Sequence, residues 1–587
     1  MAVLDHVIAV PALAKKDARR RLRIVCRCCV LALVACQLWV GRYVIDADGT
    51  AYVDVARAWL RGDWLHALNP YWSPLYTWLL AGAFAIFHPS MHWELPLIHA
   101  VNFLEFVAAF AAWEWLTAEW ELWQGPPARP LLVDVTGYCV LLWAGLRLTE
   151  LWRFNNADTL VMALLIAAAA ILVRVRRGIS TNRDFVLFGL VLGAGFLAKT
   201  AFSTEIPVFL IVIALLLRSW RNRYILAVIL MTCAVASPLI AAISIANRRF
   251  TMGDSGRLNY SWHVTGMSVE GYKESAHWPD PDIQHPIRVL MQHPRVLSFD
   301  QHVVGTLPIH SDVSWWCSGY PVRFDRSRQL MVLWSNIKFT IYAFRCPALL
   351  LLLLALVYDA SRVVKRFARA WFVWVPGLLF AAAYTPVFSD YRYLAGSYAV
   401  IGFALIAAAW RTEVPRGVAR IAIWVLPLIT AVALMGGPFR QMLPQLIRDT
   451  AGKKLPWGYE NIQVAETMRR VGLQAGDRVA YIGADLPAAH VGLERAHIVA
   501  VVPETVTQDD NIRGRPLTFD FPKQDEFWRS SPERKQRVYD AFRSVGAKWV
   551  FADTVPEWAD VIGWTVAGGS HNLRNTDRPH TYFRKLQ

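Results

Sequence analysis

The chain has 587 residues, of which 55% are hydrophobic and 18% charged, and its mean hydropathy is +0.31. A soluble protein carries charge on about a quarter of its residues, and apolar blocks of about 17–25 residues match bilayer-spanning helices. The composition therefore excludes an ordinary soluble protein and predicts a polytopic membrane protein. The net charge of +16 does not indicate nucleic-acid binding, because the basic residues form short clusters between apolar blocks.

The N-terminal segment 1–23 is basic, and no small-residue cleavage site follows the first apolar block. We therefore predict a cytoplasmic N-terminus and a retained first helix. Five basic clusters are expected to be cytoplasmic: Lys15–Arg23, Arg174–Arg183, Arg218–Arg223, Arg362–Arg369 and Arg411–Arg420. With every cluster inside, about eleven crossings follow, at 24–41, 95–118, 131–149, 158–173, 184–202, 205–217, 224–246, 346–358, 371–388, 393–410 and 418–436.

This topology requires that the apolar segment Tyr71–Phe87 does not cross the membrane. The segment begins with Trp and Tyr and follows an amphipathic stretch, which favours a helix lying at the outer interface. We therefore predict a transmembrane domain over 24–436, with outer loops at 42–94 and 247–335.

The C-terminal tail, 437–587, is polar and differs in character from the preceding blocks. Its "GDRVAYIGADLPAAHVGLERAHIVAVVPE" indicates strand, glycine turn, short helix and strand, and "KQRVYDAFRSVGAKWVFAD" indicates helix then strand. This alternation predicts a small extracytoplasmic α/β domain. The turn lacks the GxGxxG fingerprint, so nucleotide binding is weakly supported. The cysteines are interpreted as small core residues, and a disulfide between Cys317 and Cys346 is an alternative only if both face an oxidising compartment.

Two acids, Asp46 and Asp48, follow the first apolar block, near Gly49. One interpretation is helix capping, since Asp is common at helix starts. The other is chemical: the acids face away from the basic clusters and lead into the amphipathic "AYVDVARAWLRGDW". A carboxylate held between an interfacial helix and a bundle is partly desolvated, which should raise its pKa and improve it as a general base.

Three further polar residues are expected at outer helix ends. Asp158 lies in "LWRFNNADTL" and could be a cap or share a cavity with the first acids. Lys199, in "GFLAKTAF", could snorkel to the interface. Arg392 lies between Tyr391 and Tyr393, where a bidentate grip on an anionic group such as a lipid phosphate would explain a basic residue on the outer side.

The motifs "DADGTAYVDVARAWLRGDW…PLYTWLL", "NNADTL", "GFLAKTAF" and "YRYLAG" follow one another along the chain. Together they resemble the C-type (GT-C) membrane glycosyltransferases, above all the family 39-like group of protein O-mannosyltransferases and aminoarabinose transferases. In that group's pattern a Tyr follows an acid by four residues, as Tyr52 follows Asp48. The chain departs from the pattern at Gly49, where Glu is common, and at Thr200 and Ala201, where Gly follows the Lys.

The resemblance implies an all-α GT-C-like bundle of about 11 transmembrane helices with outer interfacial helices, beside the small α/β domain. It implies transfer of a sugar, with inversion, from a polyprenyl-phosphate carrier to a glycan, lipid or protein acceptor. The site would face the outside of the inner membrane. Asp48 would be the general base, Arg392 with Lys199 would stabilise the leaving phosphate, and Asp46 and Asp158 would orient the acceptor or the base.

The resemblance also makes Tyr52 and Tyr391 candidate substrate contacts. It leaves a divalent metal ion open, since the aminoarabinose enzymes' metal-site residues find no clear match. Two other functions compete with transfer. A transporter or flippase of a lipid-linked sugar would favour internal repeats and broken helices, which the sequence does not show. A non-catalytic membrane assembly protein would explain the tail and leave the acids without a role.

Overall fold

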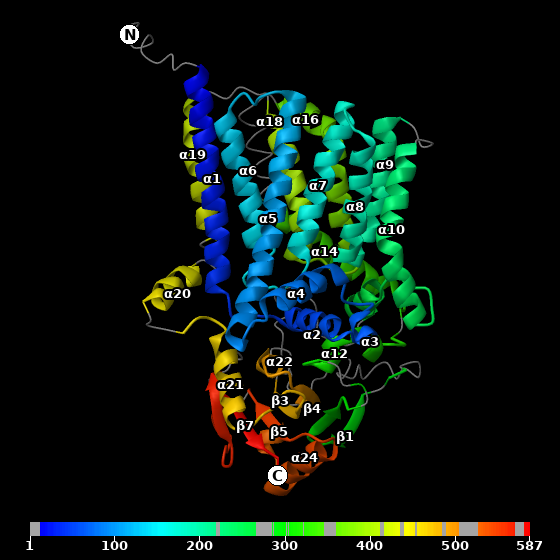
Figure 1. The fold of residues 1–587 in the computed structure, drawn as a ribbon, viewed down its shortest axis with the longest axis vertical. Coiled ribbons are helices and arrows are strands. Elements are labelled where there is room, and N and C mark those ends of the chain that lie inside the picture. Colours follow the sequence, from blue (N-terminus) through cyan, green and yellow to red (C-terminus); the bar gives the residue numbers. More distant parts are fainter. Residues whose placement is uncertain are drawn as a thin grey trace.

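We describe the protein from a computed structural model. The residues described are 12–218, 223–265, 287–300, 305–320, 322–345, 360–410, 416–434, 440–451, 455–483, 489–503, 526–553, 555–569 and 580–586, together with 284, 285 and 302. A helical bundle stands above a layer of short transverse helices, and a mixed α/β domain lies below that layer (Figure 1). The fold class predicted from the sequence is confirmed.

Seven segments of the described chain are long and apolar enough to cross a membrane. They are Arg19–Val40 in α1 (Ala12–Val40), α5 (Met91–Gln124), α6 (Pro130–Leu142) with its continuation η1 (Trp143–Leu148), α7 (Asp158–Arg177), η2 (Thr200–Thr204) with α9 (Glu205–Leu217), α10 (Arg223–Ala246) and α18 (Tyr391–Ala409). An eighth would be the pair α16 (Ala360–Arg369) and α17 (Trp371–Tyr384), which is bent by 78°.

Two more bundle helices are shorter than this criterion requires. The helix α8 (Asn182–Ala198) has 17 residues, and the apolar part of α19 (Arg416–Leu434) is Gly417–Val432. The predicted crossing at 346–358 lies outside the described residues. The chain is therefore a multi-pass membrane protein by the length and composition of its helices, and the count of about eleven crossings stays a prediction.

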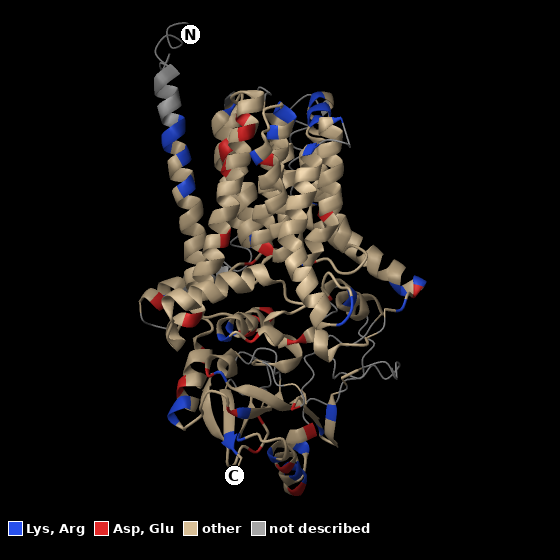
Figure 2. Cartoon of the chain, turned by 45° about the vertical axis from the view of Figure 1, so that its right-hand side comes forward, with Lys and Arg blue, Asp and Glu red and all other residues tan. Residues whose placement is uncertain are grey.

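Ion pairs place the first two basic clusters at the same end of the bundle. Arg19 donates to Glu121 at 2.8 Å, and Arg174 donates to Glu119 at 2.7 Å, so both arginines meet the last turns of α5. Arg177 also pairs with Glu119. In Figure 2 the blue positions of Lys and Arg gather at the end of the bundle away from the α/β domain, while the middle of the bundle has few charged positions. This distribution is the one that the positive-inside rule expects.

The segment Tyr71–Phe87 forms a transverse helix, as predicted. Its helix α4 (Pro74–Phe87) begins with proline at the first position and has 14 residues, or about 21 Å, against a hydrocarbon core of about 30 Å. It lies across the end of the bundle beside α2 (Ala47–Arg61), and the one-turn helix α3 (Trp64–Ala67) follows α2 (Figure 1). These helices form a layer that covers the end of the bundle facing the α/β domain.

A seven-stranded sheet with the order β1-β2-β4-β3-β5-β7-β6 forms the α/β domain. The strands of the tail are β3 (Arg478–Gly483), β4 (His497–Pro503), β5 (Trp549–Ala552), β6 (Thr565–Gly569) and β7 (His580–Lys585). The predicted strand–helix–strand and helix–strand units are confirmed, with α22 (Ala489–Leu493) and α24 (Pro532–Ser544) as their helices. Side chains of β3 alternate between two cores, Tyr481 in one and Ile482 in the other, because both faces of the sheet are covered.

The sheet also takes two strands from the loop predicted at 247–335, which the sequence assigned to the membrane domain. They are β1 (Arg288–Gln292) and β2 (Arg295–Ser298), and β2 pairs antiparallel with β4, so that Leu297 lies opposite Val501. The α/β domain is therefore not confined to the tail predicted at 437–587, because β1 and β2 also belong to it. An apolar run as short as those of "RVLMQ" and "RVLS" indicates a strand only weakly by itself, and the pairing partner of β2 lies about two hundred residues further along the chain.

The remaining described helices are short or lie between the two layers. They are α11 (Ser255–Tyr260), η3 (Ser261–Thr265), α12 (Pro308–Ser311), α13 (Val313–Trp316), α14 (Arg326–Ala343), α20 (Arg440–Thr450), α21 (Tyr459–Arg470) and α23 (Glu526–Arg529). Of these, α14 overlaps the end of the loop predicted at 247–335.

A buried carboxylate on α2 connects the layer of transverse helices to the segment 305–311 by hydrogen bonds. Asp54 is 7% exposed and accepts hydrogen bonds from the Thr306 backbone N–H (2.6 Å), the Thr306 hydroxyl (3.0 Å) and the Ser311 hydroxyl (2.7 Å). Gly305 has φ of +67°, and a Cβ there would lie 2.3 Å from Asp54 Oδ2. Glycine is therefore required at 305 both by its conformation and by the close approach of the carboxylate.

We expect Asp54→Ala to destabilise the protein by about 3 kcal/mol, because three donors that now bond a buried charged group would lose their acceptor. The measurement is the thermal unfolding midpoint of purified protein, with hydrogen exchange over 305–312 to localise the loss. Asp63→Ala is the matched control, because Asp63 lies between α2 and α3, is partly exposed and contacts only Arg61 and His66 among described charged residues. Equal midpoints for the two variants would contradict the role assigned to Asp54.

Candidate active site

A cavity of about 370 Å³ lies where the transverse helices meet the ends of the bundle helices on the side of the α/β domain (Figure 1). It collects side chains from segments far apart in the sequence. Its polar and aromatic lining comprises Asp48, Tyr52, Tyr71, Trp72, Ser73, Asn156, Asp158, Lys199, Thr200, Ser203, Thr204, Ser255, Asn259, Tyr384, Phe388, Arg392 and Tyr393. Five of the seven site residues predicted from the sequence contribute to this lining or its ion pairs, and they come from α2, α7, α18 and the end of α8.

Asp48 and Arg392 form the central ion pair of the cavity. Arg392 Nη2 donates to Asp48 Oδ2 at 2.8 Å. The Arg392 guanidinium also lies over the ring of Phe154 at 4.7 Å. The Asp48 side chain is 26% exposed, so its carboxylate is open to a molecule in the cavity. A carboxylate and a guanidinium are thus in direct contact in the cavity.

A second pair, Asp158 and Lys199, stands beside the first. Lys199 Nζ donates to Asp158 Oδ1 at 2.5 Å and lies 3.7 Å from the ring centroid of Tyr393. Arg392 Nε is 3.7 Å from Asp158 Oδ2, and neither of these two atoms has a hydrogen-bond partner in the described structure. Lys199 follows the last residue of α8 in an extended conformation, which turns its side chain into the site rather than along the helix.

Asp46 caps the helix that carries Asp48. Asp46 Oδ1 accepts hydrogen bonds from the backbone N–H groups of Gly49 and Asn155, both at 3.1 Å. A Cβ at Gly49 would lie 2.8 Å from the Asn155 Cβ, so a glutamate cannot occupy that position without displacing the neighbouring segment. Asp46 does not line the cavity. Its position supports a structural role that fixes Asp48, rather than contact with the acceptor.

The two neighbouring acids have pKa values shifted in opposite directions. Burial, with the nearby Asp48 carboxylate adding, raises the pKa of Asp46 to about 7. Burial alone would raise the pKa of Asp48 as well, but Arg392, with His310 and Lys199 adding, holds it below its usual range. The expectation that desolvation raises the pKa of Asp48 is therefore wrong for this state, because an ion pair outweighs burial.

These shifts predict how stability depends on pH. Because the pKa of Asp46 is raised in the folded protein, the folded state keeps its proton, and stability falls as pH rises from about 4 to about 7. Asp46→Asn keeps an oxygen to cap α2 and cannot ionise. We expect the thermal midpoint of the wild type to fall relative to that of Asp46→Asn between pH 5 and pH 8. Parallel curves for the two proteins would contradict the assignment.

The two predicted substrate tyrosines lie in different places. Tyr52 lines the cavity, with its ring packed against Trp72 at 4.8 Å and Tyr76 at 5.0 Å. Tyr391 does not line it, and its ring packs against Phe339 at 4.6 Å. Two residues on, Tyr393 turns inward instead, because positions i and i+2 lie on nearly opposite faces of a helix. The structure therefore places Tyr393, and not the predicted Tyr391, in the wall of the cavity.

Sequence reasoning missed several lining residues besides Tyr393. Tyr71 lies in the turn before α4 and receives a hydrogen bond from Asn259 Nδ2 at 3.4 Å. Thr200 and Ser255 exchange a hydrogen bond at 2.6 Å across the cavity wall. Thr200 was noted only as a departure from the related motif. The others lie in turns and short helices, where no periodicity marks which side chains face inward.

The carboxylates of the site do not form a metal-binding set in this arrangement. Among the residues described, no three or more His, Cys, Asp or Glu side chains are grouped to hold a metal ion. Asp46 is engaged by two N–H groups, Asp48 by Arg392 and Asp158 by Lys199, so each is already held by a donor or a cation. No catalytic step is therefore assigned to a metal.

Two other sequence predictions fall partly outside the described residues. Cys317 is buried with a free thiol, and Cys346 lies outside them, so the disulfide stays a prediction. The turn of "YIGAD" continues past Gly483 into residues that are not described.

No protein-family model matches the chain, and no curated protein does. Among solved structures, the chain is similar to ArnT from Cupriavidus metallidurans bound to undecaprenyl phosphate, at 12% identity and a TM-score of 0.49, covering 98% of this chain and 99% of that one. The apo state of the same ArnT matches at 13% identity and a TM-score of 0.47, over 95% and 97%.

An oligosaccharyltransferase from Archaeoglobus fulgidus, in complex with Zn and sulfate, is similar at 10% identity and a TM-score of 0.42, over 89% of this chain and 68% of that one. ArnT is an aminoarabinose transferase, of the group that the sequence motifs resemble. At these identities, and with TM-scores below 0.5, the reaction has to be inferred from the side chains of this chain.

Proposed function

We propose that this protein is a membrane glycosyltransferase that moves a sugar from a polyprenyl-phosphate carrier to an acceptor hydroxyl at the outer face of the cell's inner membrane. The observation that carries the proposal is the contact between Asp48 and Arg392 in a cavity that Lys199 also lines. A base and two cations at one point are what is needed to deprotonate an alcohol while a phosphate departs.

The size of the cavity supports a headgroup rather than a whole lipid. A volume of about 370 Å³ can hold a sugar phosphate, and the long apolar chain would have to leave it towards the bilayer. The rings of Tyr52, Tyr71 and Tyr393 provide the flat, partly polar walls that suit a sugar. The cavity lies at the end of the bundle away from the basic clusters, which supports the outer face.

In the proposed reaction, Asp48 accepts the proton of the acceptor hydroxyl as its oxygen attacks the anomeric carbon. The bond between that carbon and the phosphate oxygen breaks on the opposite face, so the configuration inverts. The polyprenyl phosphate leaves with the electron pair, and its negative charge is stabilised by Arg392 with Lys199. Asp158 positions the two cations, since it pairs with one and lies beside the other.

Donor binding would also prepare the base. In the structure Arg392 is bonded to Asp48, which lowers the basicity of the carboxylate. A donor phosphate offers Arg392 a second anion, and any turn of the guanidinium towards it weakens its hold on Asp48. The pKa of Asp48 would then rise towards the range of a useful base. This order avoids activating the base before a donor is present.

The test uses purified protein reconstituted in lipid with a panel of radiolabelled polyprenyl-phosphate sugars and a cell-envelope extract as acceptor. Label should move from the carrier to an acceptor fraction with at least one donor. If label crossed the bilayer still attached to its carrier, the protein would be a flippase. If no donor gave either transfer or crossing, the proposal would fail in favour of a non-catalytic role.

A further inference from the structure

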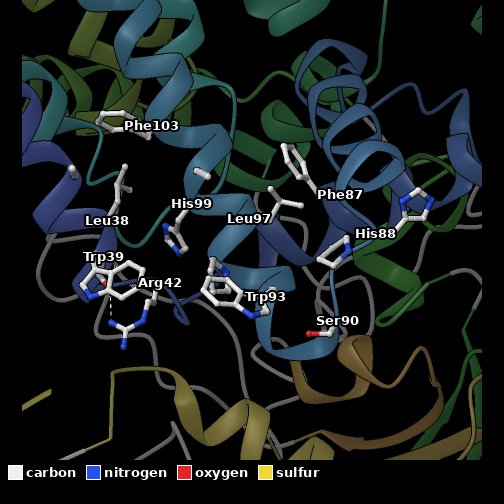
Figure 3. Close-up of a pocket in the computed structure, with 14 residues that line it drawn as sticks. Leu38, Trp39, Arg42, Phe87, His88, Ser90, Trp93, Leu97, His99 and Phe103 are labelled. Atoms are coloured by element: carbon white, nitrogen blue, oxygen red, sulfur yellow. Dashed lines mark hydrogen bonds between the residues drawn. The ribbon is translucent and has the colours of Figure 1, made fainter. Parts of the chain in front are cut away.

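A second and larger cavity, of about 650 Å³, lies beside the end of the transverse helix α4. It is formed where the end of α1 meets the end of α4 and the start of α5 (Figure 3). Its lining shares no residue with the candidate active site. The apolar part of its wall comprises Ala35, Leu38, Phe87, Pro89, Pro96, Leu97, Ala100 and Phe103.

The cavity lies at the depth of the lipid headgroups. Trp39, Trp93 and Phe87 in its wall are 48%, 61% and 66% exposed. Exposed tryptophans at helix ends mark the membrane–water interface, where an indole has apolar surroundings on one side and water on the other. The cavity is therefore open to the bilayer at that level, and molecules of the membrane can enter it sideways.

A buried histidine in the wall lacks a partner for one of its nitrogens. His99 is 3% exposed, and its Nε2 lies 2.8 Å from the Val44 carbonyl oxygen. Because a carbonyl can only accept, Nε2 carries the proton, and Nδ1 of the neutral ring is an acceptor. Nδ1 has no hydrogen-bond partner among the described residues. In Figure 3 the ring lies between Trp39 and Trp93.

The polar rim of the cavity favours an anion. Arg42 lies on one side, where its Nη1 donates to Asp449 and to the Trp39 carbonyl, both at 2.7 Å, leaving further N–H groups of the guanidinium for a ligand. Ser90, which begins the 34-residue helix α5 without a side-chain cap, lies on the other. The positive end of a helix dipole attracts phosphate. None of the lining residues is acidic.

We propose that this cavity binds a glycerophospholipid whose headgroup carries a hydrogen-bond donor, a hydroxyl or an ammonium. Its acyl chains lie along Leu38, Leu97 and Phe103, its phosphate is near Arg42, and its donor bonds His99 Nδ1. The site does not depend on the proposed transfer reaction. It adjoins that reaction's site, because the Val44 carbonyl that binds His99 lies two residues before Asp46.

The test is native mass spectrometry of the purified full-length protein titrated with phosphatidylglycerol, phosphatidylethanolamine and phosphatidylcholine of identical acyl chains. The first two carry donors in the headgroup and phosphatidylcholine carries none. For one additional hydrogen bond we expect the wild type to prefer them by about fivefold. Equal binding of all three would overturn the assignment of a donor-bearing headgroup.

Two substitutions on one face of α5 separate the cavity from general effects. Ala100→Trp fills the cavity from an exposed lining position and should abolish retained lipid. Ala108→Trp, two turns along the same helix at an exposed position outside the lining, should leave binding unchanged. Equal lipid retention by the two variants would overturn the site itself.

The role of the histidine is tested separately. His99→Leu keeps an apolar wall and should lose the preference for donor-bearing headgroups while still binding lipid. His99→Gln can supply both a donor to the Val44 carbonyl and an acceptor to the lipid, so it should recover part of the preference. A preference that survives in His99→Leu would show that Nδ1 is not the acceptor.

Discussion

Replacing Asp48 by asparagine is expected to lower kcat for sugar transfer by about a thousandfold, the middle of the range for loss of a positioned general base. Asparagine has nearly the same shape, so the cavity should persist, but its amide cannot take the acceptor proton. Donor affinity should stay equal or increase, because Arg392 would no longer be paired with a carboxylate and would be free for phosphate. The measurement combines initial transfer rates with direct binding of radiolabelled donor.

Asp63→Asn is the matched control for this experiment. It makes the same change just beyond the end of the same helix, where Asp63 pairs with His66 at 2.5 Å outside the cavity. It should transfer at the wild-type rate. Wild-type kcat in Asp48→Asn would remove Asp48 as the base. Loss of donor binding together with rate would show instead that the carboxylate supports the structure of the site.

The second large effect is expected at Arg392. Arg392→Lys keeps the charge, but an ammonium cannot contact Asp48 and Asp158 at once through a planar fork, as the guanidinium does at 2.8 and 3.7 Å. We expect kcat to fall by about a hundredfold, as when one donor to a developing anion is removed, and KM for the donor to rise as well. Arg392→Ala should be more severe in both.

Arg153→Lys serves as the control, because Arg153 lies on the segment before α7, is 57% exposed and pairs with Glu150 outside the cavity. Its kcat and KM should match the wild type. If Arg392→Lys changed only KM, the arginine would bind substrate and leaving phosphate equally and would not assist the departure. Unchanged kinetics would exclude it from the site.

The sequence predicted most of the candidate site because the positions of the basic clusters indicated which helix ends share one side of the membrane. Once the basic clusters were placed inside, Asp48, Asp158, Lys199 and Arg392 had to lie near the outer helix ends, and the structure brings all four into contact. The sequence pattern could not show which of these residues form ion pairs with each other. The pKa of Asp48 was therefore expected to rise from burial, whereas Arg392 lowers it.

The predictions that missed particular residues have a different cause. The sequence does not show in which direction a side chain points when its segment is short or irregular. Tyr391 and Tyr393 are equally close to Arg392 in sequence, and only the rotation of α18 within the bundle turns the second into the cavity. Tyr71 precedes its helix and has no periodic pattern to follow. Strands β1 and β2 were missed because their partner, β4, lies far along the chain.

By itself the sequence determined the membrane class, the transverse orientation of the segment before Phe87 and the strand–helix alternation of the tail. These follow from apolar length, from charge clusters and from local periodicity, which are properties of contiguous residues. Tertiary structure alone decided the ion pairs of the site, the capping role of Asp46, the growth of the sheet from a distant loop and the cavity around His99. Each of these depends on atoms from separate segments meeting within a few ångströms, and no local pattern encodes such a meeting.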